Sequence, residues 1–547
     1  MPNAYGPIPL VIGITGHRDL PTDVSSLEDA VREVLLEFQR RHPWSKIILL
    51  SSLAEGADRL AARLALELGI SLVVPLPLEQ SDYEDDFASE ESVAEFRSLL
   101  ARADAAFVVP PVDTTATGYA ARDRRSHAYA NCGAYLVRKS IEIVALWDGV
   151  ADPVRGTAEV VTFQLEGVPA PYVAERKELD LTVVGPVKHV ATARGNDAKV
   201  SRNDGAAART IYPRVITGAG AEAFEKAKDD IDRFNRDAVR AREGFSMRTV
   251  REEAAAVANK YRLRTTFALG TIFVMVFLSV IGFNIYSDLP SHPLWLLSVY
   301  LACVVCAFAA YYVSRREEWQ NRYQDCRALS EVLRVAHYWT MAGIADPVAE
   351  IFTENHRAEI DWLSVAIRAV TEPLADKDAT PSAQEAVVNL RRVYEEWLDH
   401  EYRYFTAFAG RRERRRYEIS ARVVSVAVIL SILLTVAMGF FPPHGLSNSL
   451  WHTLLFAAAM LAIVAGLLNS YSDKRGWAEH ARRYEVMAVL FGRARERVAE
   501  FLEHGEPDEA AIRRVREILR NLGEEAIREG AAWLDLHRSR PINVPQA

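Results

Sequence analysis

The stretch TTFALGTIFVMVFLSVIGFNI, residues Thr265–Ile285, contains no charged side chain. A helix needs about 20 predominantly apolar residues to cross a hydrocarbon core of roughly 30 Å. Three further uncharged runs of similar length follow, at Leu294–Val313, Val423–Phe441 and Leu450–Leu468. We therefore expect four transmembrane helices arranged as two hairpins, with the lipid bilayer as a partner of the chain.

Basic residues flank these runs on one side only. The flanking residues are Lys260, Arg262 and Arg264, Arg315 and Arg316, a cluster from Arg411 to Arg422, and Lys474 and Arg475. The two short connections, YSDLPSHP and PPHGLSNS, carry neither lysine nor arginine. The positive-inside bias then places both hairpin tips outside and both termini in the cytoplasm of a multi-pass protein of the inner (plasma) membrane. The N-terminal MPNAYGPIPLV has no basic segment followed by a long apolar one, so no cleavable signal peptide is predicted.

Composition excludes several classes of function. The net charge of −8 and the pI near 6.0 argue against a general nucleic-acid binder. The four cysteines fit neither a disulfide framework nor a zinc site, so we expect no metal. The apolar runs contain no carboxylate or arginine, which argues against a proton-coupled transporter.

The two hairpins have the features of a duplicated unit, predicted to span residues 219–375 and 376–547. Tyr261 and Trp319 bracket the first hairpin as Tyr417 and Trp477 bracket the second, and a long charged cytoplasmic helix follows each. Small residues recur every four positions within the spans, as at Ser298, Ala302, Cys306 and Ala310. Such stripes allow close helix packing. A pore lining in a homo-oligomer is the alternative interpretation, with a second weakly polar stripe at Ser425, Thr435 and Gly439.

Residues 8–167 alternate between apolar runs and helical stretches. The apolar runs are IPLVIGIT, KIILLSS, SLVVPL, AAFVVP and IEIVALW. This alternation predicts a Rossmann-like α/β domain with a doubly wound parallel sheet, over residues 1–218. Ligands of such sheets bind beyond the carboxyl ends of the strands.

Glycines and polar side chains follow three of these strands. Glycine lets backbone amides approach an anion, the start of a helix favours phosphate, and carboxylates accept hydrogen bonds from ribose hydroxyls. We therefore expect a nucleotide-binding site without a catalytic acid or a metal. Its predicted residues are Gly13, Thr15, Gly16, His17 and Arg18 after the first strand, Ser51, Ser52, Glu55, Gly56 and Asp58 after the second, and Asp148, Gly149, Arg155, Gly156 and Thr157 after the fifth.

Two of these segments resemble motifs of the SLOG superfamily, which includes the DprA domain, the lonely-guy (LOG) proteins and the cytosolic head of TRPM channels. SSLAEGAD resembles the SGxAxGxD turn, with Ser52 at a glycine position, and WDG followed by RGT resembles the DG…GGT element, with Arg155 at the first glycine. The hairpin units, with the ending WLDLHRSRP, resemble SLATT domains, the two-transmembrane effectors of prokaryotic defence systems. The resemblance implies a nucleotide or a nucleotide-derived second messenger as ligand, and no cofactor.

Three functions are compatible with this organisation. In the first, ligand binding to the N-terminal α/β domain opens a pore or disrupts the membrane in antiviral defence. In the second, the head is a LOG-like nucleotide N-glycosidase (phosphoribohydrolase) anchored to the membrane. LOG enzymes carry PGGxGTxxE, but PVRGTAEV at residues 153–160 lacks two glycines and moves the acid, Glu159, one position closer to Thr157. Because successive helix positions differ by 100°, this shift points the carboxylate elsewhere. The third is a constitutive structural membrane protein.

Overall fold

The computed structural model describes residues 5–112, 124–150, 156–173, 183–195, 208–214, 220–238, 246–288, 293–356, 361–371, 383–440, 448–504 and 509–538. The chain forms two compact units, each made of two segments of the sequence. The first, here called the head, comprises Met1–Glu253 and Pro347–Ala379. The second, here called the helical unit, comprises Ala254–Asp346 and Thr380–Ala547.

A seven-stranded sheet forms the centre of the head. Its strands are β1 (Leu10–Gly16), β2 (Ile47–Leu50), β3 (Ser71–Leu76), β4 (Ala105–Val108), β5 (Glu142–Trp147), β6 (Val187–Ala191) and β7 (Arg209–Ile211). Their order is β4-β3-β2-β1-β5-β6-β7, and every pair is parallel except β6 with β7. The predicted α/β fold class is confirmed, and the antiparallel edge strand β7 adds to it.

Helices cover the sheet. They are α1 (Ser25–Arg41), α2 (Ala57–Glu67), α3 (Gln80–Glu84), α4 (Glu90–Leu100), α5 (Arg124–Lys139) and α6 (Thr157–Glu166). Val11, Val73 and Ile143 share one core with buried residues of α5 and α6. The central strands β1, β2 and β5 are buried along almost their whole length, which explains why they appear in the sequence as continuous apolar runs.

The amino end of the sheet is covered by α7 (Gly220–Ala238). Lys228 of α7 forms an ion pair with Glu142 at the start of β5, with 2.7 Å between Nζ and Oε2 and both side chains buried. Asn235 of α7 donates to the carbonyl of Ile8 and accepts from its amide, next to β1. The later segment returns to the head as α11 (Val348–His356) and α12 (Trp362–Thr371), where Trp362 packs on Phe234 of α7. The carboxyl end of the sheet lies at the other end of the strands from α7.

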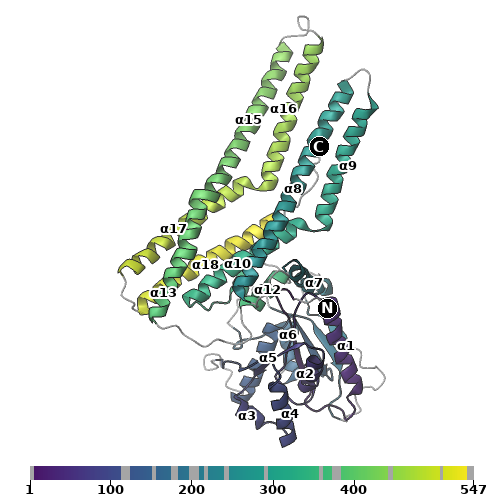
Figure 1. Ribbon diagram of the computed structural model, residues 1–547, viewed down its shortest axis with the longest axis vertical. Coiled ribbons are helices and arrows are strands. Elements are labelled where there is room, and N and C mark those ends of the chain that lie inside the picture. Colours follow the sequence, from purple (N-terminus) through teal and green to yellow (C-terminus); the bar gives the residue numbers. More distant parts are fainter. Residues whose placement is uncertain are drawn as a thin grey trace. The chain divides into compact units, whose positions relative to one another are not determined.

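Four helices of the chain are long and apolar enough to cross a membrane: α8 (Met247–Asp288), α9 (Leu294–Arg316), α15 (Gly410–Phe440) and α16 (Asn448–Arg475). Figure 1 shows α15 and α16 as one hairpin and α8 with α9 as another. Many apolar side chains on them are exposed in the single chain, among them Phe267 at 75% and Phe440 at 79%. Side chains of this kind are stable in lipid rather than in water, so the four helices indicate a multi-pass membrane protein.

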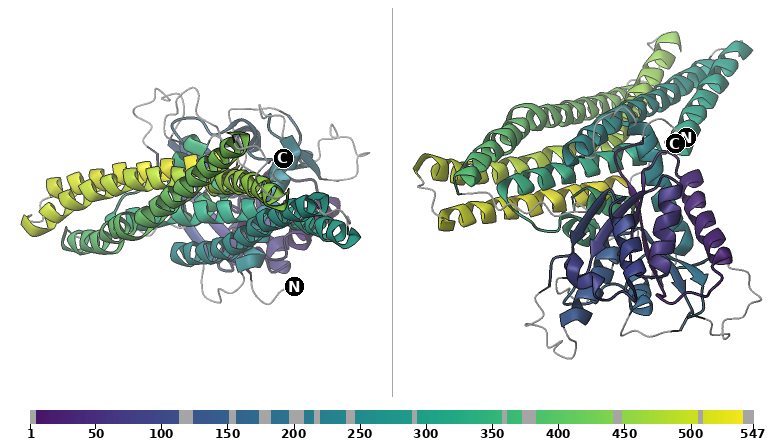
Figure 2. Two further views of the ribbon diagram at one scale, coloured as in Figure 1. Left: turned by 90° about the horizontal axis from the view of Figure 1, so that it is seen from above. Right: turned by 60° about the horizontal axis from the view of Figure 1, so that its bottom comes forward.

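The other helices of the helical unit lie next to one another (Figure 2). They are α10 (Trp319–Ala342), α13 (Ala383–Val393), α14 (His400–Arg403) with the π-helical turns Tyr394–Asp399 and Tyr404–Ala409 on either side of it, α17 (Trp477–His504) and α18 (Glu509–Arg538). Trp339 of α10 is buried against α18, where its indole donates to the carbonyl of Leu519 over 3.0 Å. A Cβ on Gly523 would lie 2.2 Å from the Trp339 ring, so this helix pair depends on a glycine.

Candidate functional site

The strand order places a topological switch point between β1 and β5. The chain moves from β1 through β2, β3 and β4 to one edge of the sheet, and then crosses to the other side of β1 to form β5. The connections after β1 and β5 therefore leave in opposite directions and open a crevice at their carboxyl ends. Gly16 ends β1 and Trp147 ends β5, so the residues after them border this crevice.

The segment after β1 is held close to both neighbouring loops. The amide of His17 donates to the carbonyl of Leu146 over 3.0 Å, and the carbonyl of His17 accepts from the amide of Ala57 over 3.1 Å. A Cβ on Gly16 would lie 2.3 Å from the Cβ of Ala57 and 2.9 Å from the Leu146 oxygen. Gly16 is therefore needed for the packing of β1 against the start of α2, whether or not a ligand is bound.

Three side chains meet at the mouth of the crevice. The amide of Asp148 donates to Nε2 of His17 over 3.0 Å, and Oδ2 of Asp148 lies 3.4 Å from the same nitrogen and 3.2 Å from Nε of Arg194. Burial lowers the pKa of His17, although Asp148 opposes this shift. The imidazole is therefore neutral at pH 7 and accepts at Nε2. Arg194 balances the Asp148 carboxylate, so the cluster can accept a ligand hydroxyl without repelling a nearby phosphate.

Arg18 provides an exposed cation beside this cluster. Its guanidinium lies over the ring of Tyr129, 5.5 Å from the ring centroid. The Tyr129 hydroxyl donates to Asp86, which also pairs with Arg125 at 2.8 Å. The ring holds the Arg18 side chain in place while its donors remain accessible, as is needed to bind an anionic group.

The loop after β2 is a strained turn that its own side chains stabilise. Leu53 and Gly56 have φ angles of +55° and +80°. A Cβ on Gly56 would lie 2.2 Å from the Arg18 carbonyl oxygen, so only glycine fits there. Asp58 is buried and accepts from the amides of Ala54 and Ser52, and its burial raises the pKa of the carboxyl to about 7.

The remaining predicted residues of this loop also have partners within the protein. Glu55 accepts from the amide of Ala88 over 2.9 Å and from the hydroxyl of Ser92. Burial opposes these hydrogen bonds, yet they lower the pKa of Glu55 below its usual value. Ser51 accepts from the Leu53 amide at 3.2 Å, and the Ser52 hydroxyl contacts the Cys132 thiol at 3.2 Å. The loop thus offers a rigid backbone at the start of α2 rather than free carboxylates.

The segment after β5 leads to a second helix start in the crevice. Gly149 and Gly156 have φ angles of +80° and +71°, and a Cβ on either would meet no atom within 4 Å. Thr157 begins α6 and is buried, and the first amides of a helix favour an anion. Arg155 lies outside the described residues. The open space at Gly156 distinguishes it from Gly16 and Gly56, which are packed against protein atoms.

Two predicted residues lie within β1 itself. Gly13 is at mid-strand, where a Cβ would lie 2.3 Å from Cδ1 of Ile143. Thr15 is buried one residue before the strand ends. The residues that direct contacts bring together are therefore Gly16, His17, Arg18, Gly56 and Asp148.

Two further contributors were not identified from the sequence. Arg194, which lies beyond the end of β6, reaches Asp148, and Tyr129 of α5 lies beneath Arg18. Neither residue belongs to a motif, and only the strand order brings them to β1 and β5. His189 of β6 contacts the Trp147 carbonyl at 2.9 Å, a contact that orders the strand end.

The described residues contain no group of three or more His, Cys, Asp or Glu side chains arranged to hold a metal ion. Comparison of the chain with known protein families, with curated proteins and with solved structures finds no match. The assignment of a function therefore depends on the geometry of the crevice and on the four apolar helices.

Proposed function

We propose that the chain is a nucleotide-sensing membrane effector. A nucleotide or a nucleotide-derived second messenger binds the head, and binding changes the state of the apolar helices. The main support is the group of polar residues at the β1/β5 switch point, where His17, Arg18, Asp148 and Arg194 lie beside two helix starts. The sequence resemblance to SLOG and SLATT domains supports the same function, in prokaryotic antiviral defence.

The crevice suits a phosphate ester of a sugar. Arg18, Arg194 and the first amides of α6 offer donors to phosphate, whereas the first amide of α2 already donates to the His17 carbonyl. The Asp148 carboxylate offers an acceptor, which suits a ribose hydroxyl, while the acceptor nitrogen of the neutral His17 is already occupied by the Asp148 amide. A ligand that contacts both the phosphate donors and the ribose acceptor touches the segments that follow β1 and β5, and so bridges the switch point.

The proposed response lies in the membrane. The hydroxyls of Ser425 and Thr435 donate to carbonyls of their own helix, and both side chains are exposed in the single chain. Ser298, Ala302 and Cys306 are likewise exposed on α9. These faces support a homo-oligomer in the inner (plasma) membrane, with cytoplasmic termini, whose assembled helices form a pore or disrupt the bilayer. Binding can change that state only through different affinities for the two conformations.

A membrane-anchored nucleotide N-glycosidase is the alternative. It requires a carboxyl group that reaches the glycosidic bond. Glu55 and Asp58 are engaged in their own loop, and Glu159 is buried in the first turn of α6. These contacts favour binding over catalysis.

The proposal is tested by ligand identification followed by flux measurements. Mass spectrometry of the purified, denatured protein identifies the bound nucleotide, and proteoliposomes are assayed for dye or ion flux with and without it. We expect ligand-dependent flux whose half-maximal nucleotide concentration rises about tenfold or more in Arg18→Ala and stays unchanged in Arg40→Ala, because Arg40 pairs with Glu33 on the exposed surface of α1. A monomer in lipid whose flux never responds to the nucleotide refutes the effector function. Turnover of the nucleotide supports the enzyme instead, and Glu55, Asp58 and Glu159 are then the first residues to change.

A further inference from the structure

The helical unit contains a basic cavity near the ends of the apolar helices. Its volume is about 670 Å³, and it is lined by residues of α8, α10, α15, α16, α17 and α18 together with Tyr404. This volume lies within the range of about 300–1,000 Å³ that is typical of small-molecule sites. The charged residues of its lining are Arg262, Arg327, Arg334, Arg412, Arg416, Lys474 and Arg475, against Glu331 and Glu413.

Most of this positive charge is not balanced within the cavity. Arg334 pairs with Glu331 and Glu401, and Arg416 pairs with Glu413. Four other arginines of the lining form no ion pair with any residue that the structure describes: Arg262, Arg327, Arg412 and Arg475. A group of unpaired guanidinium ions in a partly enclosed space attracts an anion.

Arg475 is the clearest of these cations. It ends α16, and its Nη1 donates to the hydroxyl of Thr266 in the first turn of the span expected from the sequence. Its Nε is shielded from solvent and has no hydrogen-bond partner. A donor in this state is costly unless a ligand satisfies it. Arg475 therefore marks the part of the cavity nearest to the apolar surface.

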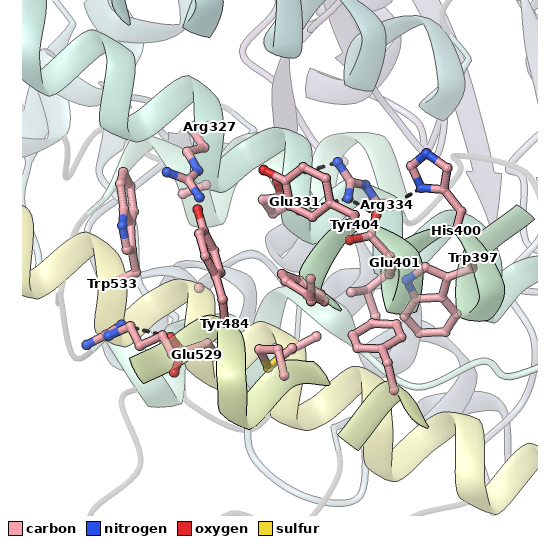
Figure 3. A pocket seen from close by; sticks show the side chains of 18 of the residues that line it. Arg327, Glu331, Arg334, Trp397, His400, Glu401, Tyr404, Tyr484, Glu529 and Trp533 are labelled. Carbon is pink, nitrogen blue, oxygen red and sulfur yellow. Dashed lines mark hydrogen bonds and ion pairs between the residues drawn. The ribbon is translucent and has the colours of Figure 1, made fainter. Parts of the chain in front are cut away.

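Arg327 lies deeper, where the basic cavity adjoins a second one. Its guanidinium lies over the ring of Trp533, 4.3 Å from the centroid, and donates to the Tyr323 hydroxyl over 3.2 Å. Figure 3 shows the Tyr484 hydroxyl directed toward it from α17. The adjoining cavity, of about 270 Å³, also has Arg327 in its lining, together with aromatic side chains such as Trp397 and the ion pairs Arg334–Glu401 and Arg483–Glu529. Arg327 is thus held by aromatic rings rather than by a carboxylate.

We propose that the basic cavity binds the phosphate-bearing headgroup of an anionic phospholipid from the adjacent leaflet. Basic pockets at the cytoplasmic ends of transmembrane helices suit such headgroups. Leu263 and Leu269 line the cavity beside the arginines, and Leu263 is 61% exposed, so a lipid can place its phosphate inside while its acyl chains remain against α8. The proposal rests on α8, α9, α15 and α16 spanning a bilayer, and is independent of what the head binds.

A bound headgroup would link the two hairpins. Arg262 belongs to α8 of the first hairpin, whereas Arg412 and Arg475 belong to α15 and α16 of the second. One phosphate that contacts both sets holds the cytoplasmic ends of the hairpins together. The lipid composition of the membrane then affects how readily they separate.

The test compares two double variants of the full chain. Arg262→Gln/Arg475→Gln removes two cations of the cavity lining. The control, Arg264→Gln/Arg316→Gln, removes two exposed arginines outside the lining, one just before the span of α8 and one just after the span of α9. Each protein is reconstituted in nanodiscs of phosphatidylcholine with and without phosphatidylglycerol, and the lipids retained after release are counted by native mass spectrometry. We expect the wild type to retain phosphatidylglycerol in preference to phosphatidylcholine. The cavity variant should retain at least about tenfold less phosphatidylglycerol than the wild type, and the control variant should retain as much as the wild type.

Three results overturn the proposal. Equal loss in both variants shows general attraction to an anionic surface, and equal retention of the two lipids by the wild type shows no preference for net charge. Displacement of phosphatidylglycerol by inorganic phosphate or glycerol phosphate assigns the cavity to a soluble phosphate ligand. Arg18→Ala should leave lipid retention unchanged, which separates this outcome from the nucleotide site of the head.

Discussion

Replacing Lys228 with methionine should loosen α7 from the sheet. Lys228 and Glu142 are 3% and 0% exposed, and 2.7 Å separates Nζ from Oε2. The methionine fills much of the space of the lysine, but it leaves the Glu142 carboxylate buried without a partner. Glu225 also contacts Lys228, at 2.8 Å, but it keeps a second partner in Arg41 and is partly exposed. The free-energy cost at Glu225 is therefore smaller than the cost at Glu142.

The cost follows from this burial. Removing one partner of a buried ion pair destabilises a protein by about 3–5 kcal/mol, and each 1.4 kcal/mol changes an equilibrium about tenfold. We therefore expect the slowest amides of β5 and α7 to exchange roughly 10²–10⁴-fold faster in the reconstituted variant, as measured by hydrogen-exchange mass spectrometry. Lys226→Met is the matched control, because Lys226 lies on the exposed face of the same helix.

The pH dependence gives a second readout. Burial already raises the pKa of Glu142, and the loss of Lys228 should raise it further. A carboxyl whose folded pKa is raised destabilises the fold when ionised, so the deficit should grow as the pH rises above the unfolded-state pKa of about 4.3 and disappear as the pH falls toward about 4. Adding Glu142→Met should recover most of the stability, since no unpaired charge then remains. Exchange in Lys228→Met within a few-fold of the Lys226→Met control would refute the reasoning.

Three further predictions concern topology, the crevice and pH. Cysteines at Ser287 and at Ser447, the latter outside the described residues, should react with an impermeant thiol reagent from outside the cell. Labelling from the cytoplasmic side alone would contradict the predicted orientation of the hairpins. Arg18→Ala should weaken nucleotide binding by about tenfold or more in calorimetry, since a charge-assisted hydrogen bond contributes about 1.5–3 kcal/mol, whereas Gly16→Val should destabilise the head itself because its side chain would overlap the Cβ of Ala57. Unchanged affinity in Arg18→Ala rejects the site. Burial lowers the pKa of His42 to about 4, so the head should lose about 3 kcal/mol of stability as the pH falls from 6.5 to 4, and His42→Asn should remove this slope in pH-dependent unfolding.

The features that the sequence predicts well are those encoded by local patterns. The spans could be recognised because twenty uncharged residues in a row have few other uses, and the strands of residues 8–147 because buried parallel strands are continuously apolar. The helical stretches expected after the first two apolar runs are present as α1 and α2.

The features that escaped prediction depend on distant segments. Arg194 reaches Asp148 only because β6 lies beside β5, and nothing in the local sequence reports that neighbour. A glycine motif likewise does not distinguish a close approach to a ligand from close packing of the protein. Gly16 and Gly56 lie against protein atoms, whereas Gly156 faces open space. The packing of Trp362 in the head was also not predicted, because its helix α12 follows the first hairpin in the sequence.

This return has a mechanical consequence. The chain leaves the head after Glu253, builds α9, α10 and most of α8, and re-enters the head at Pro347. The first hairpin is therefore an insertion tethered to the head at both ends, whereas the second is joined to it by a single crossing near Thr380. A rearrangement within the head pulls on two covalent attachments of the first hairpin at once, one through α8 and one through α10. The rearrangement reaches the second hairpin only through one covalent attachment or through the packing of the second hairpin on the first. We therefore expect the first hairpin to move first and the second to respond to it.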